Sequence, residues 1–168
     1  MRKFVHINHT KRNSMERIWI YQSSRELTAE EAIFILKRLE EFTGGWKAHG
    51  KQLAARAEVR HNRFVVIFLN EQVAAATGCS IDKSVHLLKS IEQELRIDLF
   101  DRMRIAYRKG DTIVDASRKE FEKAIEAGEV NENTIVFDNT VQTSQELESR
   151  WEVPAKESWH ARVFQLPV

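Results

Sequence analysis

Hydrophobic and polar positions are arranged along the chain in segments that predict a mixed α and β structure. The segment 17–22, RIWIYQ, is rich in β-forming residues, and 53–60 alternates apolar and polar positions as a half-buried strand does. The segment 64–70 is apolar throughout, as expected of a central strand that is covered on both faces. Because only the short polar turn 61–63 separates the last two segments, they are predicted to form a β-hairpin.

Two longer segments repeat their apolar residues with the period of an α-helix. The first begins after Thr28, which forms a capping box with Glu31, and ends at the pair Gly44 and Gly45. The second spans about residues 80–95 and carries an apolar stripe on one face.

A further alternating segment follows at 101–108, and a turn at 109–111 leads into the apolar residues 112–114. The resulting order, β-α-β-β-α-β, is that of a ferredoxin-like sandwich, in which two helices cover one face of a four-stranded antiparallel sheet. We therefore predict an α+β fold with a ferredoxin-like domain at residues 15–114.

The remaining residues predict a C-terminal appendage with the order helix, strand, helix at 115–168, packed on the first domain. Ser117 and Glu120 form another capping box, 134–137 is a short apolar strand, and a last helix begins at Thr143.

The tail after Pro154 has no recognisable period, although it contains Trp159 and Phe164. A free tail would leave these large apolar groups in water, so we expect it to pack back on the sandwich.

Composition narrows the function classes. A chain of 168 residues can bury one core domain with a small appendage. Lys and Arg total 26 against 25 for Asp and Glu, a net charge of +1, so nothing suggests a surface for nucleic acid. Cys79 is the single cysteine, which excludes an intrachain disulfide and favours a reducing compartment.

The basic segment 1–14 is predicted to be an arm, and it lacks the apolar core of a signal peptide. No run approaches the roughly 18 apolar residues of a membrane span. We therefore expect a cytoplasmic protein without a membrane anchor. His6 and His9 are too few ligands for a metal site, and neither a metal nor a cofactor is expected.

Four stretches of the chain carry a family resemblance. They are RIWIYQSSRELT, GWKAHGKQLAA, TGCSIDKSVHLLKSIEQEL and WEVPAKESWHARV. Together they resemble a family of small bacterial proteins frequently labelled "ABC transporter ATPase", over roughly residues 15–163. The label implies a bacterial source and a nucleotide-binding ATPase.

The motif that such an ATPase requires is not complete in this chain. The segment 43–52, TGGWKAHGKQ, has two glycines and a lysine at phosphate-loop spacing, but position 52 is Gln where Ser or Thr is needed. The segment also follows a predicted helix instead of a strand, and the apolar strand 64–70 ends in Asn70 instead of Asp. We therefore predict no P-loop ATPase and no ATP hydrolysis.

Two polar stretches are the candidates for a binding site. Their residues are Trp46, His49, Gly78, Cys79, Ser80 and Asp82. Trp46 continues an apolar helix stripe, so it is either core or a ligand platform. His49 is either an exposed loop residue or a group that titrates near neutral pH.

Gly78 and Cys79 precede the second helix, whose first-turn amides favour an anion or a thiolate. Cys79 could equally be a buried and inert residue. Asp82 is favourable near a helix start without any chemistry. In the predicted topology His49, Cys79, Arg108 and Lys109 all converge on one rim of the sheet, where a small anionic ligand would bind.

Three function classes follow from these residues. A non-catalytic module of the cytoplasm that binds a small ligand or a partner protein is favoured, because no complete catalytic set is present. The alternative is a thiol-dependent enzyme or redox-sensitive protein that uses Cys79, with His49 as the second catalytic candidate. A nucleic-acid binder would use Arg102, Arg104 and Arg108, although such alternating arginines usually form the wet face of a sheet. An exposed edge strand also makes a homodimer conceivable.

Overall fold

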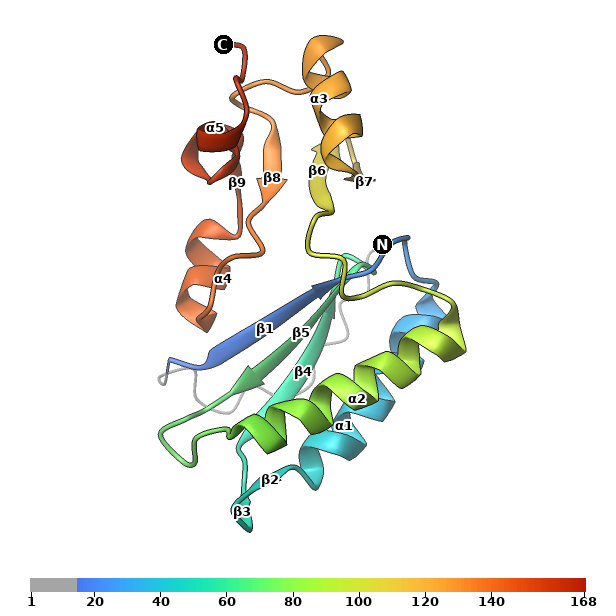
Figure 1. The fold of residues 1–168 in the computed structure, drawn as a ribbon, viewed down its shortest axis with the longest axis vertical. Helices are drawn as coiled ribbons and strands as arrows, with labels where there is room; N and C mark the ends of the chain where they lie inside the picture. Colours follow the sequence, from blue (N-terminus) through green and yellow to red (C-terminus); the bar gives the residue numbers. More distant parts are fainter. Residues whose placement is uncertain (1–14) are drawn as a thin grey trace.

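The structure is a computed structural model that describes residues 15–168. The predicted arm 1–14, with His6 and His9, lies outside the described residues. In chain order the elements are β1 (Arg17–Gln22), α1 (Ala29–Gly44), β2 (Lys47–Ala48), β3 (Lys51–Gln52), β4 (Ala55–Arg60), β5 (Phe64–Leu69), α2 (Gly78–Leu95), β6 (Ile105–Lys109), β7 (Thr112–Ala116), α3 (Arg118–Glu126), β8 (Ile135–Phe137), α4 (Ser144–Arg150), β9 (Glu152–Pro154), the 3₁₀ turn η1 (Ala155–Glu157) and α5 (His160–Val163). Figure 1 shows two halves stacked along the long axis, each built around its own sheet.

The first sheet has three antiparallel strands in the order β1-β5-β4. β4 and β5 form the predicted hairpin, and its turn holds His61 and Asn62 at φ of 53° and 49°, as in a tight type I′ turn. α1 and α2 both lie on one face of this sheet (Figure 1). α1 has the predicted capping box of Thr28 and Glu31, and its last residue is Gly44.

Both faces of the first sheet are covered, and every residue of β5 is therefore buried, as its apolar sequence predicts. On the helix side, alternate β5 residues pack in one apolar cluster with Ile35, Leu39, Leu88 and Ile91. On the other side, Phe64, Val66 and Phe68 pack with residues of the second half, which include Phe137, Leu147 and Trp151. The second half thus completes the core of the first.

The predicted fourth strand of the first sheet is not there, which corrects the ferredoxin-like four-stranded sheet. β6 pairs with β7 and β8 instead, in a second antiparallel sheet of order β7-β6-β8-β9. The edge of β1 that β6 would occupy is taken by residues 142–144. The amide of Ile18 donates to the carbonyl of Gln142 at 2.9 Å, and Arg17 forms an isolated bridge with Thr143. The class is α+β, with three small antiparallel sheets.

The second sheet packs on α3 and on the C-terminal segment. α3 begins at the predicted capping box of Ser117 and Glu120. The third apolar cluster joins Tyr107 of β6, Phe121 of α3, which is fully buried, and Phe164 of the tail. The tail does pack back on the protein, but against α3 and the second sheet and not against the helix-covered first sheet. The tail is not irregular, however, because it contains β9, η1 and α5, which are too short to show a period in the sequence.

Within residues 15–168, no helix combines the length and the apolar character needed to cross a membrane.

Candidate functional site

The two stretches singled out in the sequence do meet in space. The indole Nε1 of Trp46 donates to the carbonyl oxygen of Ser80 at 2.8 Å, and Trp46 is 2% exposed within the core cluster of the first half. Trp46 therefore acts as a core residue that fixes the start of α2 against the end of α1. The segment that follows it is not a phosphate loop, since 47–52 forms the β2–β3 hairpin.

Four of the other predicted residues, His49, Gly78, Cys79 and Asp82, are exposed and lie along the two stretches. His49 and Gly50 occupy the β2–β3 turn at φ of 50° and 76°. Cys79 is exposed in the first turn of α2, and Gly78 begins that helix instead of preceding it. Asp82 is also exposed, one turn further along. The buried position expected of an inert Cys79 is thus excluded.

The start of α2 already has its own cap, which reduces its capacity for an anion. The Thr77 hydroxyl accepts from the Ser80 amide at 3.2 Å, and the Ser80 hydroxyl accepts from the Thr77 amide at 2.8 Å. Ser80 itself is 2% exposed. This reciprocal capping box satisfies amides that an anion would otherwise use.

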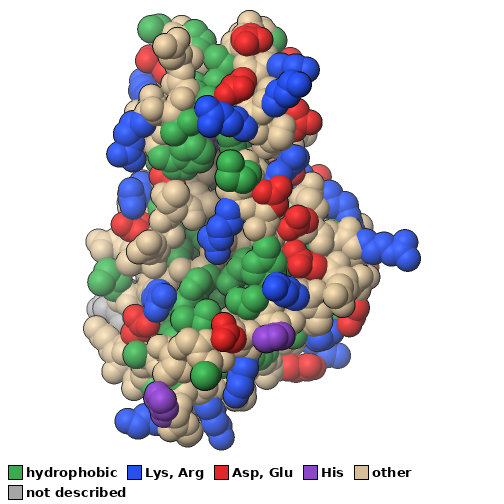
Figure 2. All heavy atoms as spheres, in the orientation of Figure 1, with side chains coloured by type: hydrophobic (Ala, Val, Ile, Leu, Met, Phe, Trp, Pro, Cys, Tyr) green, Lys and Arg blue, Asp and Glu red, His purple; other side chains and the backbone are tan. Residues whose placement is uncertain are grey.

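The arginines predicted to line one sheet face lie in the second half instead, so Arg108 and Lys109 do not join the rim of His49. Arg108 donates to Glu152, and Lys109 pairs with Glu129 at 2.9 Å. Arg104 donates to both carboxylate oxygens of Asp115 on β7. Figure 2 shows positive and negative side chains interspersed over the visible face, which offers no single-sign surface for nucleic acid.

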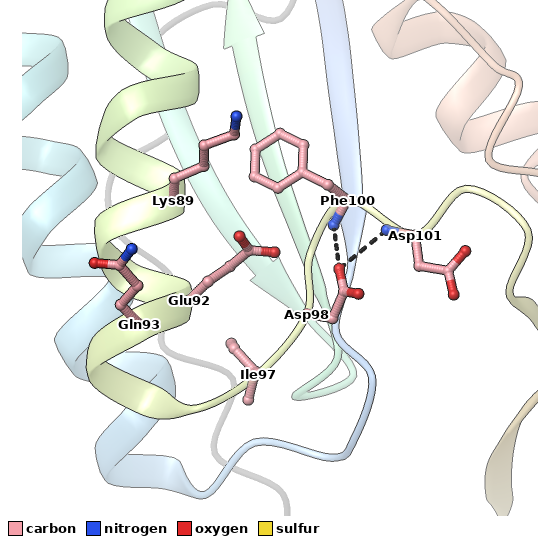
Figure 3. Close-up of a pocket in the computed structure, with 7 residues that line it drawn as sticks. All are labelled: Lys89, Glu92, Gln93, Ile97, Asp98, Phe100 and Asp101. Carbon is pink, nitrogen blue, oxygen red and sulfur yellow. Dashed lines mark hydrogen bonds between the residues drawn. The ribbon is translucent and has the colours of Figure 1, made fainter.

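An open surface hollow of about 490 Å³ lies between the end of α2 and the segment that leads to β6 (Figure 3). Its acidic side chains hold that segment in place. The Asp98 carboxylate accepts from the amides of Phe100 and Asp101 at 2.8 and 3.0 Å, and Glu92 accepts from the Leu99 amide at 2.6 Å. These carboxylates already accept hydrogen bonds from backbone amides, so the hollow is a weak candidate for a binding site.

A smaller and more enclosed cavity of about 180 Å³ lies between the two sheets, and we call it the intersheet cavity. It is lined by β1, by the segment 99–105, by the residues after β8 and by the C-terminal segment. Its apolar wall consists of Ile20, Leu99, Ile105, Phe137 and Trp159. Its polar wall consists of Gln22, Asp101, Arg102, Arg104, Asn139, Thr140 and His160.

Three polar groups of the intersheet cavity, Gln22, Asn139 and Arg104, belong to a directional chain of hydrogen bonds across the two sheets. Trp151 donates to Asn139 Oδ1 at 2.9 Å, Asn139 donates to Gln22 Oε1 at 2.9 Å, and Gln22 donates to Asp115 Oδ1 at 2.6 Å. Arg104 closes the chain on Asp115 with contacts of 3.0 and 2.8 Å. The indole can only donate, so the orientation of each amide follows from it. These groups hold the halves together.

His160 lies outside this chain, and the sequence prediction missed it. Its side chain is fully buried, and its Nε2 has no hydrogen-bond partner within residues 15–168. Its Nδ1 lies 2.7 Å from the Ser158 hydroxyl, and its ring stacks on Trp159 with centroids 3.8 Å apart. Burial lowers the pKa of His160 to about 4, although the Asp138 carboxylate opposes this shift. The imidazole is therefore neutral at physiological pH.

A buried polar atom without a partner is unusual in a folded protein and points to a ligand, a solvent molecule or a strained site. The signal in the sequence was the pair Ser158 and His160 inside an aromatic segment, but nothing in the residues alone says that this histidine is buried. Among the described residues, no group of three or more His, Cys, Asp or Glu side chains could hold a metal ion.

No family model matches the chain, and neither the curated proteins nor the solved structures include one that is significantly similar to it. The resemblance to bacterial proteins labelled "ABC transporter ATPase" stays a prediction. Function must therefore be argued from the site itself.

Proposed function

We propose that the protein is a non-catalytic module that binds a small organic ligand in the intersheet cavity. The observation that carries the proposal is the buried Nε2 of His160, which has no partner among the described residues, in a side chain that lines a partly enclosed cavity. An unpaired buried acceptor or donor costs about 1–3 kcal/mol. A ligand that supplies the missing hydrogen bond would recover this free energy on binding.

The size of the cavity restricts the ligand. A volume of about 180 Å³ corresponds to roughly six water molecules of liquid. This is below the range of about 300–1,000 Å³ that is usual for drug-sized ligands. The ligand is therefore a small molecule with an apolar side toward Ile20, Leu99 and Phe137.

The chemistry of the site supports binding over catalysis. A general base works best when its pKa lies near the working pH, and the pKa of His160 is about 4. Ser158 and His160 are spaced like a nucleophile and its base, but Ser158 is 8% exposed and is not among the residues that line the cavity. A substrate in the cavity would meet the imidazole and not the hydroxyl.

Three sequence-based predictions remain beside this proposal. A thiol-dependent or redox role for Cys79 has in its favour that the thiol is exposed. A homodimer and a cytoplasmic location are compatible with a small module that carries a free thiol. Two features support the predicted ferredoxin-like fold: the strand order β1-β5-β4 and the two helices on one face of that sheet.

The proposal is tested by a ligand-observed NMR screen of small metabolites against the wild-type protein. Hits should lose binding to His160→Phe, which fills the site and removes Nε2. They should keep binding to Asp82→Asn, a matched change of an exposed residue at the rim of the first half. Hits that depend on Asp82 and ignore His160 would move the site to the rim, and a screen without hits would refute a small-ligand function.

A further inference from the structure

We infer that His160 presents an unprotonated Nε2 to the intersheet cavity, so that the ligand is a small aromatic or heterocyclic molecule that donates a hydroxyl or N–H hydrogen to it. This inference rests on the proposed function and names the ligand class. It follows from counting hydrogens around Ser158.

Three groups surround the Ser158 hydroxyl oxygen. The carbonyl oxygen of Ala155 lies at 3.0 Å, the amide nitrogen of His160 at 3.3 Å and Nδ1 of His160 at 2.7 Å. A serine hydroxyl has one hydrogen and two lone pairs. The carbonyl can only accept and the amide can only donate, so the hydroxyl hydrogen goes to Ala155 and one lone pair takes the His160 amide.

With this assignment the remaining lone pair of Ser158 faces Nδ1, which then carries the hydrogen. The opposite arrangement would send the hydroxyl hydrogen to Nδ1, place two oxygens 3.0 Å apart without a hydrogen between them, and leave the Ala155 carbonyl with the Ser158 amide at 3.2 Å. Because a neutral imidazole carries one hydrogen, Nε2 is left with a lone pair. The acceptor state of His160 is thus set by the turn that precedes α5.

The surroundings of Nε2 define the rest of the ligand. Phe137 and Trp159 belong to the apolar wall of the cavity, together with aliphatic side chains. Flat apolar molecules pack well against aromatic rings. The polar chain that ends at Asp115 already pairs Gln22 and Asn139, and the Asp101 carboxylate is exposed, so the buried acceptor left for the donor of the ligand is His160.

The protonation state can be measured without any ligand. In a long-range ¹H–¹⁵N spectrum at neutral pH, Nδ1 of His160 should show the shift of a protonated ring nitrogen and Nε2 that of an unprotonated one. Ser158→Ala removes the acceptor of Nδ1–H and should produce a mixture of the two tautomers. A hydrogen on Nε2 in the wild-type protein would overturn the inference whatever the variant does.

The ligand class is tested with 4-fluorophenol and 4-fluoroanisole, two probes of similar shape whose ¹⁹F signals report binding. The phenol donates a hydrogen and the ether cannot. We expect the phenol to bind the full chain at least about tenfold more tightly, because the ether leaves the buried acceptor unpaired. Binding of the phenol should also move the Nε2 resonance. Equal affinity of the two probes, or binding of neither, would overturn the inference.

These results separate the inference from the proposed function. If the metabolite screen yields ligands that depend on His160 but lack a donor, the inference fails and the binding function stands. If the screen yields no ligand while the tautomer is as expected, the binding function fails and this donor class fails with it.

Discussion

Acidification between about pH 6.5 and pH 4 should destabilise the protein through protonation of His160. The imidazole has a folded-state pKa of about 4 and an ordinary value of 6.5. A depressed pKa means that the unfolded chain binds the proton more tightly. Its contribution to stability is therefore complete above about pH 6.5 and is lost as the pH falls toward 4.

The magnitude follows from the same two pKa values. One pKa unit corresponds to about 1.4 kcal/mol, and between about pH 7.5 and pH 4.5 the linkage relation gives a loss of about 2.5 kcal/mol in the free energy of unfolding. Carboxylates lose their contribution to stability at lower pH than His160 does. Glu31, whose pKa the Arg25 hydrogen bond lowers to about 2, loses its contribution only below the ordinary carboxyl value of 4.5.

The assay is urea unfolding at several pH values, with the free energy of unfolding compared between wild type and His160→Gln. The variant has no titrating group at this position, so its stability should fall by about 2.5 kcal/mol less over the window. His49→Gln is the matched control, because it removes an exposed histidine outside the cavity. A His160→Gln variant with the same pH dependence as wild type would refute the buried, neutral His160.

Three further predictions concern other parts of the structure. Asn139→Ala leaves Trp151 Nε1 without its acceptor and should lower stability by about 2 kcal/mol, or the melting temperature by about 4–8 °C; a change within error would show that the polar chain does not hold the halves together. Truncation after Pro154 removes Phe164 from the third cluster and should lower the melting temperature by more than about 6 °C, and an unchanged melting curve would show a dispensable tail. Cys79 should react with one equivalent of a thiol reagent in the native state at the rate of a free small thiol, and Cys79→Ser should not react. Native Cys79 that is unreactive would contradict its exposure, whereas a rate at least about tenfold faster would favour the thiol-dependent alternative.

Local features of the fold could be predicted because they depend on residues that are close together in the sequence. The capping boxes at Thr28 and Ser117 are present, as is the hairpin whose turn includes His61. The apolar run of β5 correctly indicated burial on both faces. Each of these depends on side-chain size, period or a capping hydroxyl within a few positions.

Strand pairing could not be predicted in the same way. β6 was assigned to the first sheet because it completes a familiar element order, yet its partners are β7 and β8. The edge of β1 is instead occupied by residues more than a hundred positions away, at Gln142 and Thr143. Periodicity shows that a segment is a strand but not which edge it joins.

The same distinction between local and long-range contacts applies to the candidate site. Trp46 and Ser80 were expected to converge and they do, because helix and strand order decide which end of a sheet a loop occupies. His160 was not predicted as a site residue, since its burial arises from contacts between α5, α3 and the second sheet. A buried, unpaired nitrogen is a property of the tertiary structure and has no pattern in the sequence.

The central claim is that the intersheet cavity is a ligand site whose acceptor is His160. It is tested most directly by a crystal structure of the protein with 4-fluorophenol. The account predicts the fluorinated ring between the two sheets, with its hydroxyl oxygen about 2.6–3.2 Å from Nε2 of His160. A cavity closed by side chains with Nε2 bound to another protein group, or a ring bound only in the open hollow near Phe100, would contradict it.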